Sequence, residues 1–162
     1  HIDMRKRIIP LLLAFMVAMG AWAQCPFFSE CENNKNVTTV FITKAMLQMA
    51  SELPGVNGDQ MTLLRDKIDN VQIVTSENSS GRKFMEKRIG QFSPANGYEL
   101  LMQVKEDGEN VKISRLSLSN GKYRYVIVVN ETKELAVVIA EGRLSLSDMK
   151  NFKGGEVVSG NS

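Results

Sequence analysis

Residues 98–141 read YELLMQVKEDGENVKISRLSLSNGKYRYVIVVNETKELAVVIAE and decide the fold of this chain. They contain four runs in which apolar and polar residues alternate, which is the pattern of half-buried β-strands. Asp107-Gly108 and Asn120-Gly121 separate the first three runs, and both dipeptides are typical of tight hairpins. The stretch therefore predicts a four-stranded antiparallel meander, which the rest of the chain would cover.

The first hairpin predicts its own register. A two-residue loop at Asp107-Gly108 places apolar residues opposite each other, Val104 with Val111 and Met102 with Ile113. The alternation then slips, because Leu116 and Leu118 are also apolar. A β-bulge near residues 114–115 would restore it, and we expect one there.

The last turn of the meander lies near residues 130–134. We expect an odd loop of three or five residues, because it keeps Ile127 on one face with Leu135, Val137 and Ile139. The opposite face would then carry the second set of apolar residues of these strands, namely Val126, Val128, Ala136, Val138 and Ala140. Either a helix or the N-terminal segment covers this set, or it forms a partner surface for a second copy or another envelope protein.

The flanking segments predict further elements of the same domain. We expect strands at 37–43 and 70–75, and helices at about 44–53, 60–68, 80–92 and 148–152. Thr43 would cap the first helix, and Ser145 or Ser147 the last. The order predicts an α+β two-layer sandwich, in which an antiparallel sheet with a C-terminal four-strand meander packs against two or three helices.

The N-terminal region indicates an exported protein. Residues 1–3 precede Met4 and are interpreted as a remnant of cloning, and residues 4–23 have the basic start, apolar run and A-x-A end of a signal peptide. We expect a flexible leader at 24–36, a single domain at 37–152 and a disordered tail at 153–162. The location would be periplasmic or secreted, with no transmembrane segment in the mature chain.

Two cysteines lie in the expected leader. Cys25 could be acylated in a lipoprotein of the outer membrane, but Gln24 stands where lipoprotein signals have a small residue, so we favour the unlipidated protein. In an oxidising compartment, Cys25 and Cys31 could form a local disulfide.

Composition excludes several classes of function. The only histidine is His1, in the expected remnant, which excludes Ser-His-Asp and Cys-His catalysis and most His-based metal sites from the mature chain. Removal of residues 1–23 would also leave equal numbers of basic and acidic residues, so charge gives no case for nucleic acid. We find no cofactor motif.

A few polar residues could form a catalytic pocket. Lys44, Asp66, Asp69 and Glu77 are the candidates, and the alternative function is an envelope hydrolase that uses carboxylate or Ser/Lys chemistry. Asp66 and Asp69 are three positions apart on an expected helix, where a solvated face is the commoner explanation. We therefore lean toward a protein that is not an enzyme.

Four segments carry a family resemblance: VTTVFITKAM (37–46), KIDNVQIVTSE (67–77), YELLMQVKEDGENVKI (98–113) and AEGRLSLSDM (140–149). With the preceding signal, they resemble the domain-of-unknown-function 4252 family of small exported Bacteroidetes-type proteins. The resemblance covers about residues 37–152 and implies an envelope or periplasmic location, but no catalytic residue. We therefore expect a noncatalytic exported binding or interaction module of the bacterial cell envelope.

Overall fold

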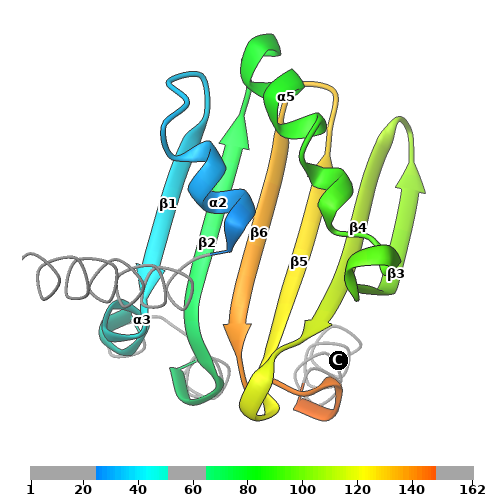
Figure 1. Cartoon of the computed structure of the whole chain (residues 1–162). Helices are drawn as coiled ribbons and strands as arrows, with labels where there is room; N and C mark the ends of the chain where they lie inside the picture. Colours follow the sequence, from blue (N-terminus) through cyan, green and yellow to red (C-terminus); the bar gives the residue numbers. More distant parts are fainter. Residues whose placement is uncertain (1–24, 51–64, 149–162) are drawn as a thin grey trace, which may run out of the picture.

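The fold is an α+β sandwich built on one antiparallel sheet, as the sequence predicts. The structure is a computed structural model and describes residues 25–50 and 65–148. The strands lie in the order β1-β2-β6-β5-β4-β3 (Figure 1). They are β1 Thr38–Thr43, β2 Ile68–Ser76, β3 Glu99–Glu106, β4 Glu109–Ser117, β5 Tyr123–Asn130 and β6 Leu135–Gly142. The two N-terminal strands therefore extend the meander beyond β6.

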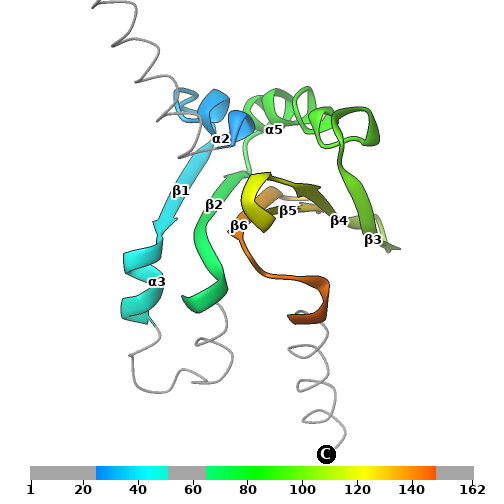
Figure 2. The ribbon, with the colours of Figure 1, turned by 60° about the horizontal axis from the view of Figure 1, so that its bottom comes forward.

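Short helices lie on both sides of the sheet. Helices α2 (Pro26–Cys31) and α5 (Ser79–Glu86) cross one face, and α3 (Lys44–Ala50) and the segment after β6 lie on the other side (Figure 2). The described residues also contain 3-10 turns at Ile89–Gln91 (η1), Pro94–Asn96 (η2) and Ser119–Gly121 (η3). The predicted helix at 60–68 lies mostly outside the described residues, and β2 already begins at Ile68.

Two predicted helix caps are present. The amide of Met46 donates a hydrogen bond to the hydroxyl of Thr43 at 3.3 Å, which caps α3. Ser145 and Asp148 cap the start of the last helix reciprocally, with each backbone amide donating to the other side chain. The rest of that helix, through residue 152, lies outside the described residues.

The segment predicted to be a flexible leader instead forms part of the core. Phe27 and Phe28 of α2 are almost completely buried, together with Cys25 and Cys31. They pack in one cluster with side chains of the covered face of the sheet, including Val74, Val126, Leu135, Val137 and Ile139. The prediction of a leader was wrong because this face needs apolar cover, and only the folded protein shows which segment supplies it.

Helix α5 closes over the upper end of the same face. The side chain of Asn78 accepts a hydrogen bond from the amide of Ser80 at 2.8 Å and so caps the helix. A Cβ on Gly81 would lie 2.2 Å from the carbonyl oxygen of Asn36, so only glycine allows the helix to approach β1 this closely. The helix therefore holds the start of β1 against the end of β2.

The first hairpin of the meander has the predicted register. Val104 pairs with Val111 and Met102 pairs with Ile113, and Asp107 and Gly108 both have positive φ. The bulge is present but lies on the other strand. The register shifts between Leu100 and Met102 on β3, whereas β4 pairs with β5 without a shift. The apolar residues of β4 therefore lie on both faces and need no bulge of their own.

The last loop of the meander has four residues, 131–134, and not three or five. Glu131 donates its amide to the carbonyl oxygen of Glu134 at 2.9 Å, which closes this turn. The even length places Ile127 opposite Val138 and Val126 opposite Ile139. The two apolar sets of β5 and β6 are therefore combined differently from the prediction, because one residue of loop length exchanges the faces of a strand.

Candidate functional site

The sheet has one apolar face of which the described helices cover only the lower end; we call it the open face. Two rows of side chains run across all six strands on it. The middle row consists of Val40, Ile73, Val138, Ile127, Ile113 and Met102. The upper row consists of Thr38, Thr75, Ala136, Val129, Val111 and Val104. Every residue of both rows is apolar except the two threonines.

The open face is accessible in these two rows. At its edges, Val40 and Val104 are each 43% exposed and Met102 is 39% exposed. None of the side chains in either row belongs to the two hydrophobic clusters that the described residues form. A contiguous apolar surface of this extent is typical of a site that contacts another molecule.

The predicted partner surface is only partly brought together on this face. Ala136 and Val138 lie in the two rows, and Ala140 lies below them. Val126 and Val128 lie on the covered face instead, where Val126 is 1% exposed beneath the helices. The four-residue loop between β5 and β6 is the reason for this exchange, and Ile127 and Val129 take the two places on the open face.

The lower end of the open face is closed by the chain itself. Leu47 of α3 and Leu144, which follows β6, pack there against Ile68 and Tyr125. The Tyr125 hydroxyl donates a hydrogen bond to the carbonyl oxygen of Leu144 at 2.5 Å. This closed end defines one boundary of the exposed apolar rows.

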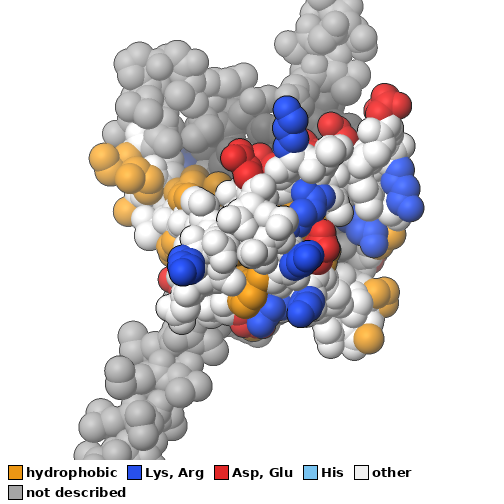
Figure 3. All heavy atoms as spheres, turned by 90° about the horizontal axis from the view of Figure 1, so that it is seen from above, with side chains coloured by type: hydrophobic (Ala, Val, Ile, Leu, Met, Phe, Trp, Pro, Cys, Tyr) orange, Lys and Arg blue, Asp and Glu red, His pale blue; other side chains and the backbone are white. Residues whose placement is uncertain are grey.

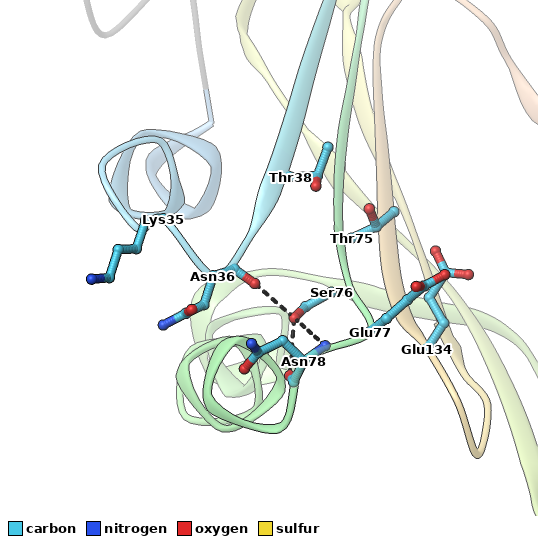
Figure 4. Close-up of a pocket in the computed structure, with 8 residues that line it drawn as sticks. All are labelled: Lys35, Asn36, Thr38, Thr75, Ser76, Glu77, Asn78 and Glu134. Carbon is cyan, nitrogen blue, oxygen red and sulfur yellow. Dashed lines mark hydrogen bonds between the residues drawn. The ribbon is translucent and has the colours of Figure 1, made fainter.

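The upper boundary of the open face is rich in carboxylates. Glu77, Glu106 and Glu109 continue the alternation of β2, β3 and β4 beyond the upper row, and Glu134 lines a pocket of about 420 Å³ with Glu77. Figure 4 shows both carboxyl groups toward the same side of this pocket. Lys and Arg side chains are interspersed at this end of the molecule (Figure 3). We call these four glutamates the acidic rim.

The same pocket contains a serine whose role is structural. The Ser76 hydroxyl lies 2.9 Å from the carbonyl oxygen of Asn36 and 3.1 Å from that of Asn78, and it accepts from the Asn78 amide (Figure 4). These contacts tie the start of β1 to the end of β2 and to α5. Ser76 is only 4% exposed, so its hydroxyl is not accessible as a nucleophile.

A second polar site, here called the charged cleft, lies at the lower ends of β2, β5 and β6. It has a volume of about 490 Å³, and its charged and amide lining residues include Lys44, Asp69, Asn70, Lys122, Arg124 and Glu141. Lys44 lies 3.5 Å from one carboxylate oxygen of Asp69, and Lys122 lies 2.9 Å from the other. Burial opposes the ionisation of Asp69, but these two lysines outweigh it and lower the pKa of its carboxyl group.

The inner wall of the charged cleft is a buried ion pair. Arg124 donates through Nε to Glu141 at 2.5 Å, and both side chains are largely buried. The other carboxylate oxygen of Glu141 accepts from the side-chain amides of Asn70 at 3.2 Å and Gln72 at 3.1 Å. Gln72 in turn accepts from the backbone amide of Cys25 at 2.9 Å. Alternation patterns do not reveal this network, because its members come from distant strands and from α2.

The structure separates the four predicted pocket residues into three places. Lys44 and Asp69 meet in the charged cleft, as described above. Asp66 is exposed and pairs with the neighbouring Arg65 at 3.2 Å, and Glu77 belongs to the acidic rim at the other end of the sheet. Asp69 does not lie on a helix, as the sequence suggested, but on β2.

The two cysteines are free thiols in the core. Cys25 precedes α2 and Cys31 ends it, so a rise of about 1.5 Å per residue separates them by about 9 Å. This exceeds the roughly 7 Å limit between the Cα atoms of a disulfide, so the predicted bridge would require α2 to unwind. Burial raises the pKa of the Cys25 thiol, and it raises the pKa of the Cys31 thiol to about 11.

Both thiols are therefore expected to be protected in the folded protein. Their reaction with an aromatic disulfide reagent at pH 8 should be roughly a thousandfold slower than in the urea-unfolded chain, since the unfolded fraction limits the rate. Stopped-flow absorbance measures this difference, and two thiols should be counted after unfolding. Fast labelling of either cysteine in the native state would contradict the burial of the thiols. A mass that is lower by two hydrogens, as in a disulfide, would contradict their being free.

Comparison with known proteins gives a family but no function. A family model described as "Domain of unknown function (DUF4252)" matches residues 28–152. No curated protein matches the chain. Among the described residues, no helix has both the length and the apolar character needed to cross a membrane.

Proposed function

Because the chain belongs to the DUF4252 family, whose description assigns no activity, we propose from its geometry that it is a noncatalytic binding module of the cell envelope. The open face carries this proposal. Its middle row holds six apolar side chains, one from each strand, and its upper row adds four more. Burial of a large apolar side chain contributes about 1.5–3 kcal/mol, so the face offers substantial binding free energy.

The shape of the face favours an amphipathic helix of another protein as the occupant. Strands lie about 4.8 Å apart, so each row is about 24 Å wide across six strands. A helix of about 16 residues has this length at about 1.5 Å per residue. A helix is also the element that the protein itself uses on the covered face, where α2 and α5 pack against the same strands.

The acidic rim indicates the charge of this partner. Glu77, Glu106, Glu109 and Glu134 border the upper row, and directly opposite carboxylates such as Glu106 and Glu109 repel each other. Lys or Arg side chains beside the apolar stripe of the partner would relieve this repulsion. The rim also disfavours a second copy stacked with both acidic ends together.

Export rests on residues 4–23, whose composition is that of a signal peptide. The place of Cys25 supports the unlipidated form. Its side chain is fully buried, and its backbone nitrogen donates to Gln72. A lipid-modified Cys25 would have to leave this position, because acylation uses both the sulfur and the amino nitrogen of an N-terminal cysteine.

The alternative of a hydrolase has one observation in its favour, which is the meeting of Lys44 and Asp69 in the charged cleft. However, a general base works best when its pKa lies near the operating pH. The two lysines move the pKa of Asp69 in the opposite direction, and keep the carboxylate ionised. The cleft is therefore better suited to holding a ligand than to moving a proton.

A photo-crosslinking amino acid in place of Val40 tests the proposed partner directly. In the cells that make the protein, we expect a covalent adduct whose crosslinked peptide, read by mass spectrometry, has an apolar stripe flanked by Lys or Arg. The matched control places the same amino acid at Lys87, which is exposed on the α5 side. It should give no such adduct.

Val138→Glu in the same background should abolish the adduct by placing a charge in the middle row. Its free energy of unfolding should fall by less than about 1 kcal/mol, because no described element covers this side chain. An adduct with a second copy or with this chain itself would overturn the proposed partner, as would an adduct that survives Val138→Glu.

A further inference from the structure

We propose that the charged cleft is a second binding site, for a small hydroxylated monoanion such as a sugar acid. The cleft lies on the covered side of the sheet, because Arg124 and Glu141 in its lining share the face of Val126 and Ile139. Helices α2 and α5 cross this face, whereas the open face is on the opposite side (Figures 1 and 2). It is therefore separate from the surface that carries the proposed function, and neither proposal depends on the other.

A β-bulge places the central carboxylate of this site. The register of β2 against β6 shifts between Ile68 and Asn70, so Asp69 is the extra residue. A bulge of this kind turns a side chain out of the regular alternation of a strand. Here it brings Asp69 to Lys44, at the start of α3, and to Lys122, before β5. Three separate segments thus converge on one carboxylate.

The charges of the cleft do not cancel. Lys44, Lys122 and Arg124 face only two carboxylates, those of Asp69 and Glu141, which leaves one positive charge. Arg124 and Glu141 satisfy each other in the inner wall, so the excess belongs to the two lysines. An ammonium group has three N–H donors, and the contact with Asp69 occupies one on each lysine. The remaining donors can bind an anion that enters from solvent.

The lysines are accessible and the wall behind them is rigid. The side chains of Lys44 and Lys122 are 47% and 37% exposed, whereas those of Arg124 and Glu141 are 13% and 8% exposed. The buried pair and its amide partners are held by hydrogen bonds before any ligand arrives, which lowers the entropic cost of binding.

The remaining lining residues point to the hydroxyl groups of the ligand. Ser119 and Asn120 supply hydroxyl and amide groups that can both donate and accept hydrogen bonds. The cleft volume of about 490 Å³ lies within the range of small-molecule sites. A sugar acid combines the single negative charge and the hydroxyl groups that this lining matches.

Calorimetric titration of the mature protein with glucuronate tests the site. We expect saturable binding that is at least about tenfold tighter than that of glucose, which lacks the charge, or of acetate, which lacks the hydroxyl groups. Lys122→Gln and Lys44→Gln should each weaken glucuronate binding by about tenfold, whereas Lys87→Gln, directly after α5, should leave it unchanged. Circular dichroism establishes that each variant is folded.

Asp69→Asn distinguishes anion binding by Lys44 and Lys122 from a purely structural role of their ion pairs with Asp69. It keeps the shape of the side chain but removes the competing charge, so glucuronate should bind about fivefold more tightly. Weaker binding by this variant, no binding by the parent protein, or binding that Lys122→Gln leaves intact would overturn the proposal. Val138→Glu on the open face should not alter the titration, so failure of the partner site and failure of the cleft are distinguishable.

Discussion

Replacement of Glu141 by Ala is expected to lower the free energy of unfolding by about 3–5 kcal/mol. Glu141 is 6% exposed and accepts hydrogen bonds from Arg124, Asn70 and Gln72. Its removal leaves the guanidinium group of Arg124 buried without a counter-ion and two side-chain amides without their acceptor. Urea unfolding followed by circular dichroism measures the loss.

Two further variants isolate the cause. Glu99→Ala removes the partner of Arg115, a pair with an exposed carboxylate, and should cost less than about 1 kcal/mol. Arg124→Met combined with Glu141→Leu removes both charges and should recover most of the stability lost by Glu141→Ala, because a buried pair contributes little compared with a buried single charge. A double variant that is less stable than Glu141→Ala would contradict this explanation.

Phe27→Ala should also cost about 3–5 kcal/mol, the usual range for a buried Phe. Phe27 is fully buried, and its ring lies 5.2 Å from that of Phe92 between α2 and the turns after α5. The loss of the ring leaves a cavity over the covered face. Thermal or urea unfolding of the mature protein measures the effect.

Glu32→Ala is the matched control for Phe27→Ala, because it follows α2 directly and is exposed. It should change the free energy of unfolding by less than about 0.5 kcal/mol. An equally small effect of Phe27→Ala would mean that residues 25–36 behave as the flexible leader that their composition suggests.

Local patterns were sufficient for most of the sheet. The alternation and Asp107-Gly108 together predict the residue pairs of the first hairpin, because a two-residue turn allows only one pairing register. The Asn120-Gly121 turn was less well predicted. It contains three residues, Ser119–Gly121, so Leu116 lies opposite Arg124, whereas a two-residue turn at Asn120-Gly121 would place Leu116 opposite Tyr125. The turn signal indicates a hairpin, but packing selects its length.

The candidate sites show the same division. Lys44 and Asp69 were chosen for their chemistry, and the bulge in β2 brings them together. Lys122, Arg124 and Glu141 were missed, because each looks like an ordinary polar position of an alternating strand. The sequence contained one weak signal. Arg124 and Glu141 are charged, although the neighbouring positions on the same face of β5 and β6 are apolar.

The sequence by itself determined the meander, the two added strands and the α+β class, because period-2 alternation and turn dipeptides act over a few residues. Only the tertiary structure decided which face each strand presents to the helices, since one residue of loop length between β5 and β6 exchanges them. It also decided that α2 fills the core and that the described helices leave most of the other face uncovered. These are properties of long-range packing, where segments compete for the same apolar surface.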